Sequence, residues 1–159
     1  MANIENIIFE SQIALWRESI KPNLDQALEL TPEDKLDWAP AEGMITIGNI
    51  FLHISECSDW WYDEVVNGKK AIDLSPSATA KFPPKAEIVK YMQIHWERME
   101  RLFAAVPDFI GQTFEVKGKE KIHHFTGAWI YTHLLEHDLH HRSQIHQYLR
   151  LLGIKPPSI

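Results

Sequence analysis

The chain has 159 residues, of which 45% are hydrophobic and 24% charged, and its formal net charge is −6. The length predicts a single domain over residues 1–159, and the acidic balance excludes the basic groove of a nucleic-acid-binding protein. No apolar run approaches the roughly 18 residues of a membrane span, the N-terminus lacks the basic segment of a signal peptide, and the single cysteine excludes an internal disulfide and favours the reducing cytoplasm.

The first helical pattern covers residues 4–30, with an approximate apolar stripe. Pro22 interrupts this stripe, so we expect a kink or a break just before it. Thr31 and Pro32 then have the residue types of a helix start, a cap followed by proline, with acids in the first turn. A short helix is therefore predicted between Thr31 and Trp38.

A second long helix is predicted for residues 46–66, and Gly68 lies where it should stop. Its isoleucines recur at helical spacing and predict a buried face. At the edge of that face runs a second stripe, made of His53, Cys57, Trp60 and Glu64. A side chain at such a border can meet another helix across a cleft.

Residues 68–84 form a long connection without clear periodicity, and such connections are often crossovers or functional lids. A third helix is predicted for residues 84–106 and should end at Pro107. Between residues 108 and 125 the pattern favours a small hairpin around Gly118.

The fourth helix is predicted for residues 126–152, about 40 Å long at 1.5 Å per residue. Its inward seam comprises Ile130, Leu134, His137, His141, Ile145, Tyr148 and Leu152. A core built only for packing would carry leucine in place of His137 and His141. Two imidazoles one turn apart can bind one metal ion, and burial keeps them uncharged and available as ligands.

Four long helices joined by long connections predict an all-α fold, a four-helix bundle. The link between the second and third helices is long enough to span a helix, at about 3.3 Å per extended residue. We therefore expect these two helices to run parallel, with a crossover between them.

His53 is the natural third ligand, because it lies on a different helix from His137 and His141. Three neutral imidazoles around Zn²⁺ or Ni²⁺ leave positions for water or substrate, which is typical of catalytic metal sites. Such an ion lowers the pKa of bound water to about 7 and can deprotonate a bound thiol. The alternatives are a hydrogen-bonded His53 at a helix edge and a solvated histidine pair without metal.

Three further residues near these histidines have open roles. His133 lies one turn before His137 and could replace His141, although it is off the seam. Cys57 could bind a soft metal or be a small buried core residue. Glu56 could orient a ligand ring by a hydrogen bond, or be solvated.

The remaining candidates have both a functional and a structural interpretation. Arg142 could pair with an acid, bind an anionic substrate or form a surface salt bridge. Asp138 and His140 point away from the seam and are expected to be exposed. Of Trp60 and Trp61, we expect one to wall a pocket over the metal and the other to pack the core.

Several stretches, in order along nearly the whole chain, resemble the DinB/YfiT-like metalloproteins. The matching stretches are residues 38–40 (WAP), 47–53 (IGNIFLH), 137–144 (HDLHHRSQ) and 148–153 (YLRLLG). The third of these matches the family pattern H-x-x-x-H-R-G-Q, with Ser143 in place of the usual glycine; both residues are small.

The resemblance implies a four-helix bundle with parallel second and third helices. It also implies a divalent metal on His53, His137 and His141, and frequently a homodimer. Characterised relatives include thiol-dependent transferases and isomerases that use bacillithiol or mycothiol. The family name refers to induction by DNA damage, and nothing in this sequence supports DNA binding.

Our leading hypothesis is a metal-dependent enzyme, a thiol S-transferase or a hydrolase, whose metal activates a thiol or water. Its partners would be a small-molecule substrate and a low-molecular-weight thiol, and the sequence identifies no catalytic side chain beyond the ligands. The second hypothesis is a non-catalytic metal-binding module for dimerisation or stress response. The third treats the histidines as a pH-responsive core without metal.

Overall fold

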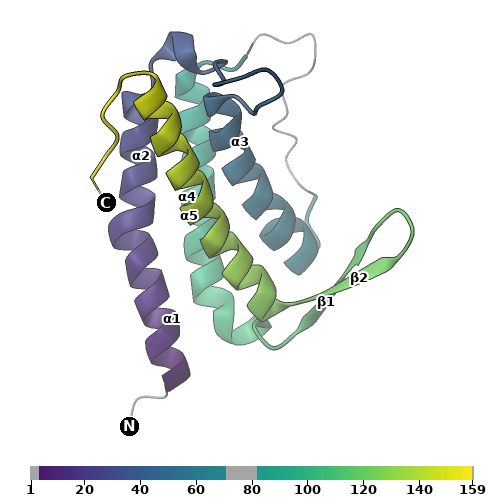
Figure 1. The fold of residues 1–159 in the computed structure, drawn as a ribbon. Helices are drawn as coiled ribbons and strands as arrows, with labels where there is room; N and C mark the ends of the chain where they lie inside the picture. Colours follow the sequence, from purple (N-terminus) through teal and green to yellow (C-terminus); the bar gives the residue numbers. More distant parts are fainter. Residues whose placement is uncertain (1–3, 71–81, 159) are drawn as a thin grey trace.

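The computed structural model describes residues 4–70 and 82–158, and the described chain is mostly helical with one small two-stranded sheet (Figure 1). The elements are α1 (Ile4–Leu15), η1 (Trp16–Ile20), α2 (Lys21–Leu30), η2 (Glu33–Lys35), α3 (Ile47–Ser58), η3 (Asp59–Val66), α4 (Lys85–Phe109), β1 (Thr113–Lys117), β2 (Ile122–Thr126) and α5 (Gly127–Leu151). The prediction of a mostly helical protein is therefore confirmed. The all-α class does not describe the whole fold, because the hairpin forms a small β-sheet.

A kink or a break was predicted just before Pro22, and the first rod, made of α1, η1 and α2, has a local irregularity there without being broken. The backbone instead widens into a π-helical stretch at η1, where the Lys21 N–H donates to the carbonyl of Trp16, five residues back. Proline has no N–H to donate, and in a regular helix its ring would collide with the carbonyl of Glu18. One π-helical turn just before the proline absorbs this conflict.

The short helix predicted after Thr31 is only the 3₁₀ turn η2. The Thr31 hydroxyl donates to the carbonyl of Ala27 at 2.8 Å, so its side chain closes the end of α2 instead of capping the next element. Pro32 takes the cap position of η2. The prediction that Thr31 caps the next helix was wrong, because its hydroxyl bonds instead to a backbone carbonyl one turn back.

The helical stretch α3–η3 runs in the same direction as α4. Ser55 donates to the carbonyl of Tyr91 at 3.0 Å, and further along both elements Tyr62 donates to the carbonyl of Arg101 at 3.1 Å. From the first contact to the second, the residue numbers increase along both elements, as they do only between parallel elements. Figure 1 shows both helices descending side by side. The predicted crossover falls largely on residues 71–81, which lie outside the described residues.

The end of α4 differs from the prediction, because the helix continues past Pro107 to Phe109. The Ile110 N–H still donates to the carbonyl of Val106 at 3.0 Å. Pro107 therefore removes one hydrogen bond from the last turns of the helix but does not end the helix. The predicted hairpin around Gly118 is present, and its antiparallel register pairs Phe114 with Phe125.

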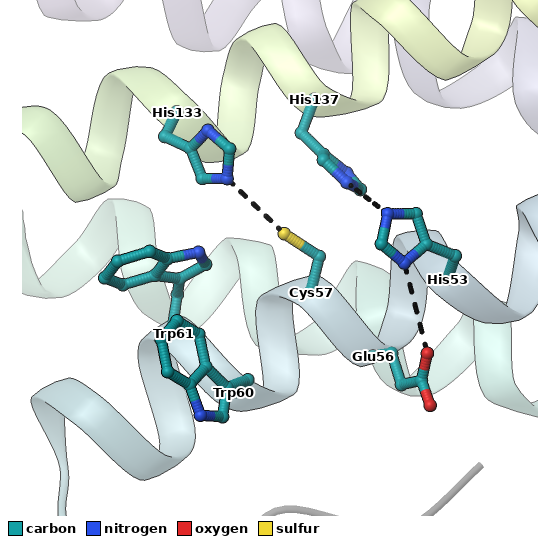
Figure 2. A pocket seen from close by; sticks show the side chains of 7 residues that line it. All are labelled: His53, Glu56, Cys57, Trp60, Trp61, His133 and His137. Atoms are coloured by element: carbon teal, nitrogen blue, oxygen red, sulfur yellow. Dashed lines mark hydrogen bonds and ion pairs between the residues drawn. The ribbon is translucent and has the colours of Figure 1, made fainter. Parts of the chain in front are cut away.

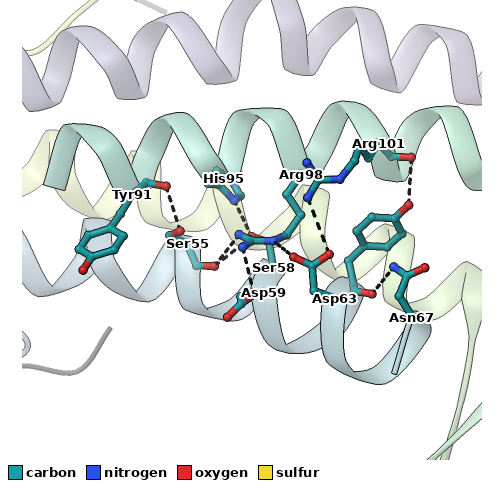
Figure 3. Close-up of polar contacts among 10 residues, drawn as sticks. Ser55, Ser58, Asp59, Asp63, Asn67, Tyr91, His95, Arg98 and Arg101 are labelled. Carbon is teal, nitrogen blue, oxygen red and sulfur yellow. Dashed lines mark hydrogen bonds and ion pairs between the residues drawn. The ribbon is translucent and has the colours of Figure 1, made fainter. Parts of the chain in front are cut away.

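A buried polar network joins α3–η3 to α4 (Figure 3). Arg98 is 1% exposed and donates to Asp63 at 2.7 Å, to Asp59 at 3.0 Å and to the Ser58 hydroxyl at 3.0 Å. Ser58 also lies 2.8 Å from His95 Nδ1. A desolvated guanidinium is tolerated only with such a complete set of acceptors.

Asp138 is 1% exposed, which contradicts the prediction that it faces solvent. Its Oδ2 accepts a hydrogen bond from the Trp16 indole at 2.8 Å and lies 2.9 Å from His95 Nε2. The prediction assumed one inward face on α5, whereas α5 packs against α3, α4 and the first rod. His140 is exposed, as predicted.

The hydrophobic core runs along the interior between the long helices and includes Trp16, Phe51, Met99 and Tyr131. Among residues 4–70 and 82–158, no helix combines the length and the apolar character that a bilayer span requires.

Candidate metal centre

His53 on α3 and the pair His137 and His141 on α5 converge in space. One ring nitrogen from each lies within 4.8 Å of the other two. The pair is buried on the seam of α5, at 9% and 8% exposure, and the side chain of His53 at the border of α3 is 45% exposed. The structure thus brings together all three of the predicted ligands.

The spacing of these nitrogens fits a metal ion. His137 Nε2 lies 3.1 Å from His53 Nε2. Two ligands of a tetrahedral Zn²⁺, each about 2.0–2.1 Å from the ion, would lie roughly 3.3 Å apart. Within the described residues, His137 Nδ1 is buried without a hydrogen-bond partner. The close approach of the His53 and His137 Nε2 atoms, with a nitrogen of His141 nearby, makes the donor set suitable for a divalent ion.

A chain of hydrogen bonds orients His141. Its Nδ1 lies 2.9 Å from Gln144 Oε1, the Gln144 amide donates to the Tyr148 hydroxyl at 3.5 Å, and that hydroxyl donates to the carbonyl of Ile45 at 3.2 Å. Gln144 Oε1 can only accept, so the proton of His141 is on Nδ1 and the Nε2 lone pair is left for the cluster. Gln144 ends the stretch that matches the family motif but had no predicted role, although its spacing of three residues from His141 was a usable signal.

Glu56 lies one turn from His53, with its Oε2 4.0 Å from His53 Nδ1. This distance is too long for a direct hydrogen bond. It does place the carboxylate on the Nδ1 side of the ring, opposite the nitrogen that faces His137. Glu56 therefore favours the tautomer that leaves the His53 Nε2 lone pair free for a metal ion.

The buried rings are neutral at physiological pH. Burial, reinforced by the neighbouring His141 and His53, lowers the pKa of His137 to about 2. Burial also lowers the pKa of His141. A protonated imidazole cannot bind a metal ion, so these lowered pKa values keep both rings available as ligands.

His133 and Cys57 form a separate pair beside the cluster. Cys57 Sγ lies 3.7 Å from His133 Nε2. Burial, with the charges of Asp138 and Glu56, raises the pKa of Cys57 to about 12, so the thiol is protonated. Neither residue belongs to the group of converging ligands in the described chain, and His133 does not replace His141 there.

A cavity of about 570 Å³ opens beside the cluster (Figure 2). It is lined by His53, Glu56, Cys57, Trp60, Trp61, His133 and His137. We predicted that one tryptophan would wall the pocket and the other pack the core, whereas both line the pocket and Trp61 is also 6% exposed and packed in the core. Volumes of this size hold small-molecule ligands.

Arg142 lies away from this cavity, and none of its three predicted roles fits. It is buried, donates to the Ser19 hydroxyl at 3.2 Å, and burial lowers its pKa. No carboxylate forms an ion pair with it among residues 4–70 and 82–158. Its helix position places it against the first rod, which periodicity on α5 alone could not indicate.

Comparison with known proteins identifies the type of fold. A family model described as the DinB superfamily matches residues 18–145. The crystal structure of a DinB-like protein from Bacillus subtilis, YjoA, is similar with a TM-score of 0.60 and 16% sequence identity, over 94% of this chain and 95% of that one. At this identity the structural likeness shows the fold alone. No curated protein matches the sequence.

Proposed function

Because this chain belongs to the DinB superfamily, we propose that it is a divalent-metal-binding protein that acts as a metal-dependent enzyme of the thiol S-transferase or hydrolase type. The observation that carries the proposal is the convergence of His53, His137 and His141, from two helices, within 4.8 Å. The adjoining cavity supports a catalytic over a purely structural centre, because it gives a small molecule access to the same nitrogens.

The three histidines would hold Zn²⁺ or Ni²⁺, both of which suit imidazole ligands. When bound, such an ion would act as a Lewis acid that lowers the pKa of a thiol or water in the pocket. Three protein ligands leave at least one coordination position, and the cavity beside His53 and His137 is where a substrate would reach it.

The other residues of the site would orient and shield the centre. Gln144 and Tyr148 hold the His141 ring in one tautomer through hydrogen bonds, and the charge of the nearby Glu56 carboxylate favours the corresponding tautomer of His53. Trp60 and Trp61 supply apolar surface that a bound substrate would cover, displacing water from the pocket. The loss of that water would strengthen every electrostatic interaction with a reacting group.

The proposal includes the architecture implied by the family: a single domain over residues 1–159, built as a four-helix bundle with a crossover between the parallel α3 and α4. The parallel contacts of α3–η3 with α4 support the crossover, since the connection between them has to return along a helix length. Homodimerisation, a cytoplasmic location and the use of a low-molecular-weight thiol stay predictions.

Metal analysis of the purified protein tests the proposal. We expect about one divalent ion per chain, lost in His137→Ala and kept in His124→Ala, a control in which an exposed histidine on β2 is removed. Equal metal content in both variants, or none in the native protein, would refute the metal centre.

Turnover is tested next, with a thiol and 1-chloro-2,4-dinitrobenzene for transfer and with p-nitrophenyl acetate for hydrolysis. We expect activity with one of these that disappears in His137→Ala and survives in His124→Ala. Stoichiometric metal without activity on either class would favour the non-catalytic alternative.

A further inference from the structure

One side of the cavity is lined by Trp60, Trp61 and His133, and the rings of Phe125 and Trp129 contact Trp61; we call these five residues the aromatic wall. Trp61 is at its centre, with its ring centroid 4.4 Å from Trp60, 4.9 Å from Phe125, 5.0 Å from Trp129 and 5.7 Å from His133. His133 also stacks on Trp129 at 4.7 Å, with 14° between the ring planes. Three elements, η3, β2 and α5, thus contribute rings to one surface.

The aromatic wall continues to the histidine cluster without a break. The rings of His133 and His137 are 5.7 Å apart, and those of His137 and His53 are 4.8 Å apart. Figure 2 shows Trp61, Cys57 and His133 on one side of the pocket and His53 with His137 on the other. A ligand in this cavity therefore has an aromatic end and a metal-facing end.

The aromatic end carries no charge. Among the described residues that line the cavity, none is a lysine or arginine. The single carboxylate, Glu56, lies on the His53 side, and Cys57 is a protonated thiol at the foot of the wall. An anionic group placed against Trp60 and Trp61 would lose its hydration without gaining a counter-charge.

We propose that this cavity selects a substrate with a flat, uncharged aromatic ring, which lies against Trp60 and Trp61 while a donor atom of the substrate faces His53, His137 and His141. Only the metal-facing end of this proposal rests on the proposed function; the aromatic end does not depend on it. Because the ring centroid of His133, in the wall, is 5.7 Å from that of His137, in the cluster, the donor atom is attached to the ring directly or through one carbon. Aromatic pairs in face-to-edge or offset-stacked contact add affinity beyond simple burial.

A series of three thiols tests this substrate class. The Co²⁺-loaded protein is titrated with benzyl mercaptan, 2-mercaptoethanol and 3-mercaptopropionate, and the sulfur-to-cobalt charge-transfer band reports binding. We expect benzyl mercaptan to bind about tenfold or more tightly than 2-mercaptoethanol, as expected for one buried ring. We expect 3-mercaptopropionate to bind most weakly. Equal affinities, or a preference for the anionic thiol, would overturn the proposal.

Two substitutions of Trp60 separate ring contact from simple filling of space. Trp60 is only partly buried, so replacing it disturbs the core less than replacing Trp61. Trp60→Phe keeps a ring, and we expect affinity for benzyl mercaptan to stay within about twofold. Trp60→Leu keeps apolar volume without a ring, and we expect about a three- to tenfold loss. Affinity for 2-mercaptoethanol should be unchanged in both variants, and an equal loss for both thiols would count against a ring site.

The aromatic end can also be tested without metal. Benzyl alcohol added to the metal-free protein should shift the NMR signal of the Trp60 indole N–H, whereas ethanol should not. If no thiol gives a charge-transfer band but benzyl alcohol shifts this signal, the proposed metal function fails and the ring site stands. If the charge-transfer band forms, but benzyl alcohol does not shift the Trp60 signal and thiols with and without a ring bind equally, the ring site fails and the metal function stands.

Discussion

His95 Nε2 lies 2.9 Å from Asp138 Oδ2, and both side chains are almost fully buried. Asp138 follows the candidate ligand His137 directly, so two adjacent residues of α5 serve two different sites. His137 faces α3 and the pocket, while Asp138 faces α4 and the first rod, where Trp16 donates to the same carboxylate oxygen. The carboxylate thus joins three helices next to the candidate metal centre.

Removing this carboxylate should destabilise the protein strongly. Asp138→Ala leaves the donors of His95 and Trp16 buried without their acceptor, and we expect a loss of about 3 kcal/mol in the free energy of unfolding, measured with urea. Asp138→Asn keeps one acceptor oxygen and should cost less. A loss below 1 kcal/mol for the alanine variant would show that the network adds little.

The buried guanidinium of Arg98 should matter far more than that of its neighbour. Arg98→Ala removes the guanidinium that pairs with Asp59 and Asp63. We therefore expect the free energy of unfolding to fall by about 3 kcal/mol or more, which is typical of broken buried ion pairs. Arg101→Ala is the matched control, because Arg101 is half-exposed and 3.7 Å from Asp63. Exposed pairs contribute about 0–1 kcal/mol. Similar losses in the two variants would contradict this account.

Gln144 should control metal affinity without binding the metal. Gln144→Ala removes the acceptor that holds His141 Nδ1–H, and such supporting partners typically contribute about 10- to 100-fold in affinity. Competition with a chromophoric chelator measures the change. Gln147→Ala, an exposed glutamine on the same helix, is the control and should leave the affinity as it was. Equal effects of the two substitutions would remove Gln144 from the site.

The metal-free protein should lose stability in acid, beginning near pH 6.5. Burial first, and neighbouring histidines next, lower the pKa of His137 from 6.5 to about 2 in the folded state. Between these values the unfolded chain binds a proton that the folded chain does not, so stability is present above pH 6.5 and falls as the pH decreases. Burial lowers the pKa values of His141 and His146 as well, in the same sense.

Urea unfolding of chelator-treated protein at pH 8, 7, 6 and 5 measures this dependence. The slope between pH 6.5 and 5 should become shallower in His137→Leu, which removes one titrating group, and should be unchanged in His124→Leu. A slope that does not respond to His137→Leu would show that its ring is not buried uncharged. With Zn²⁺ present, the decline should be steeper, because acid also releases the metal.

The sequence by itself determined the features that depend on neighbours along the chain. Helix periodicity located the long helices, and the caps Thr46 and Thr126 are where the sequence placed their starts. The i,i+4 spacing of His137 and His141 put both on one buried face, because a helix turn is a local property of the backbone. The family motif rests on the same local pattern.

Only the tertiary structure decided which faces meet. The 3.1 Å approach of His53 to His137, the burial of Asp138 and the ring contacts of Trp61 depend on helices distant in sequence. Periodicity predicts one inward face for each helix, but α5 packs against α3, α4 and the first rod, so residues flanking the seam can be buried as well. Long-range packing is set by the sum of all the interfaces at once, and a pattern within one helix carries no information about the partner across from it.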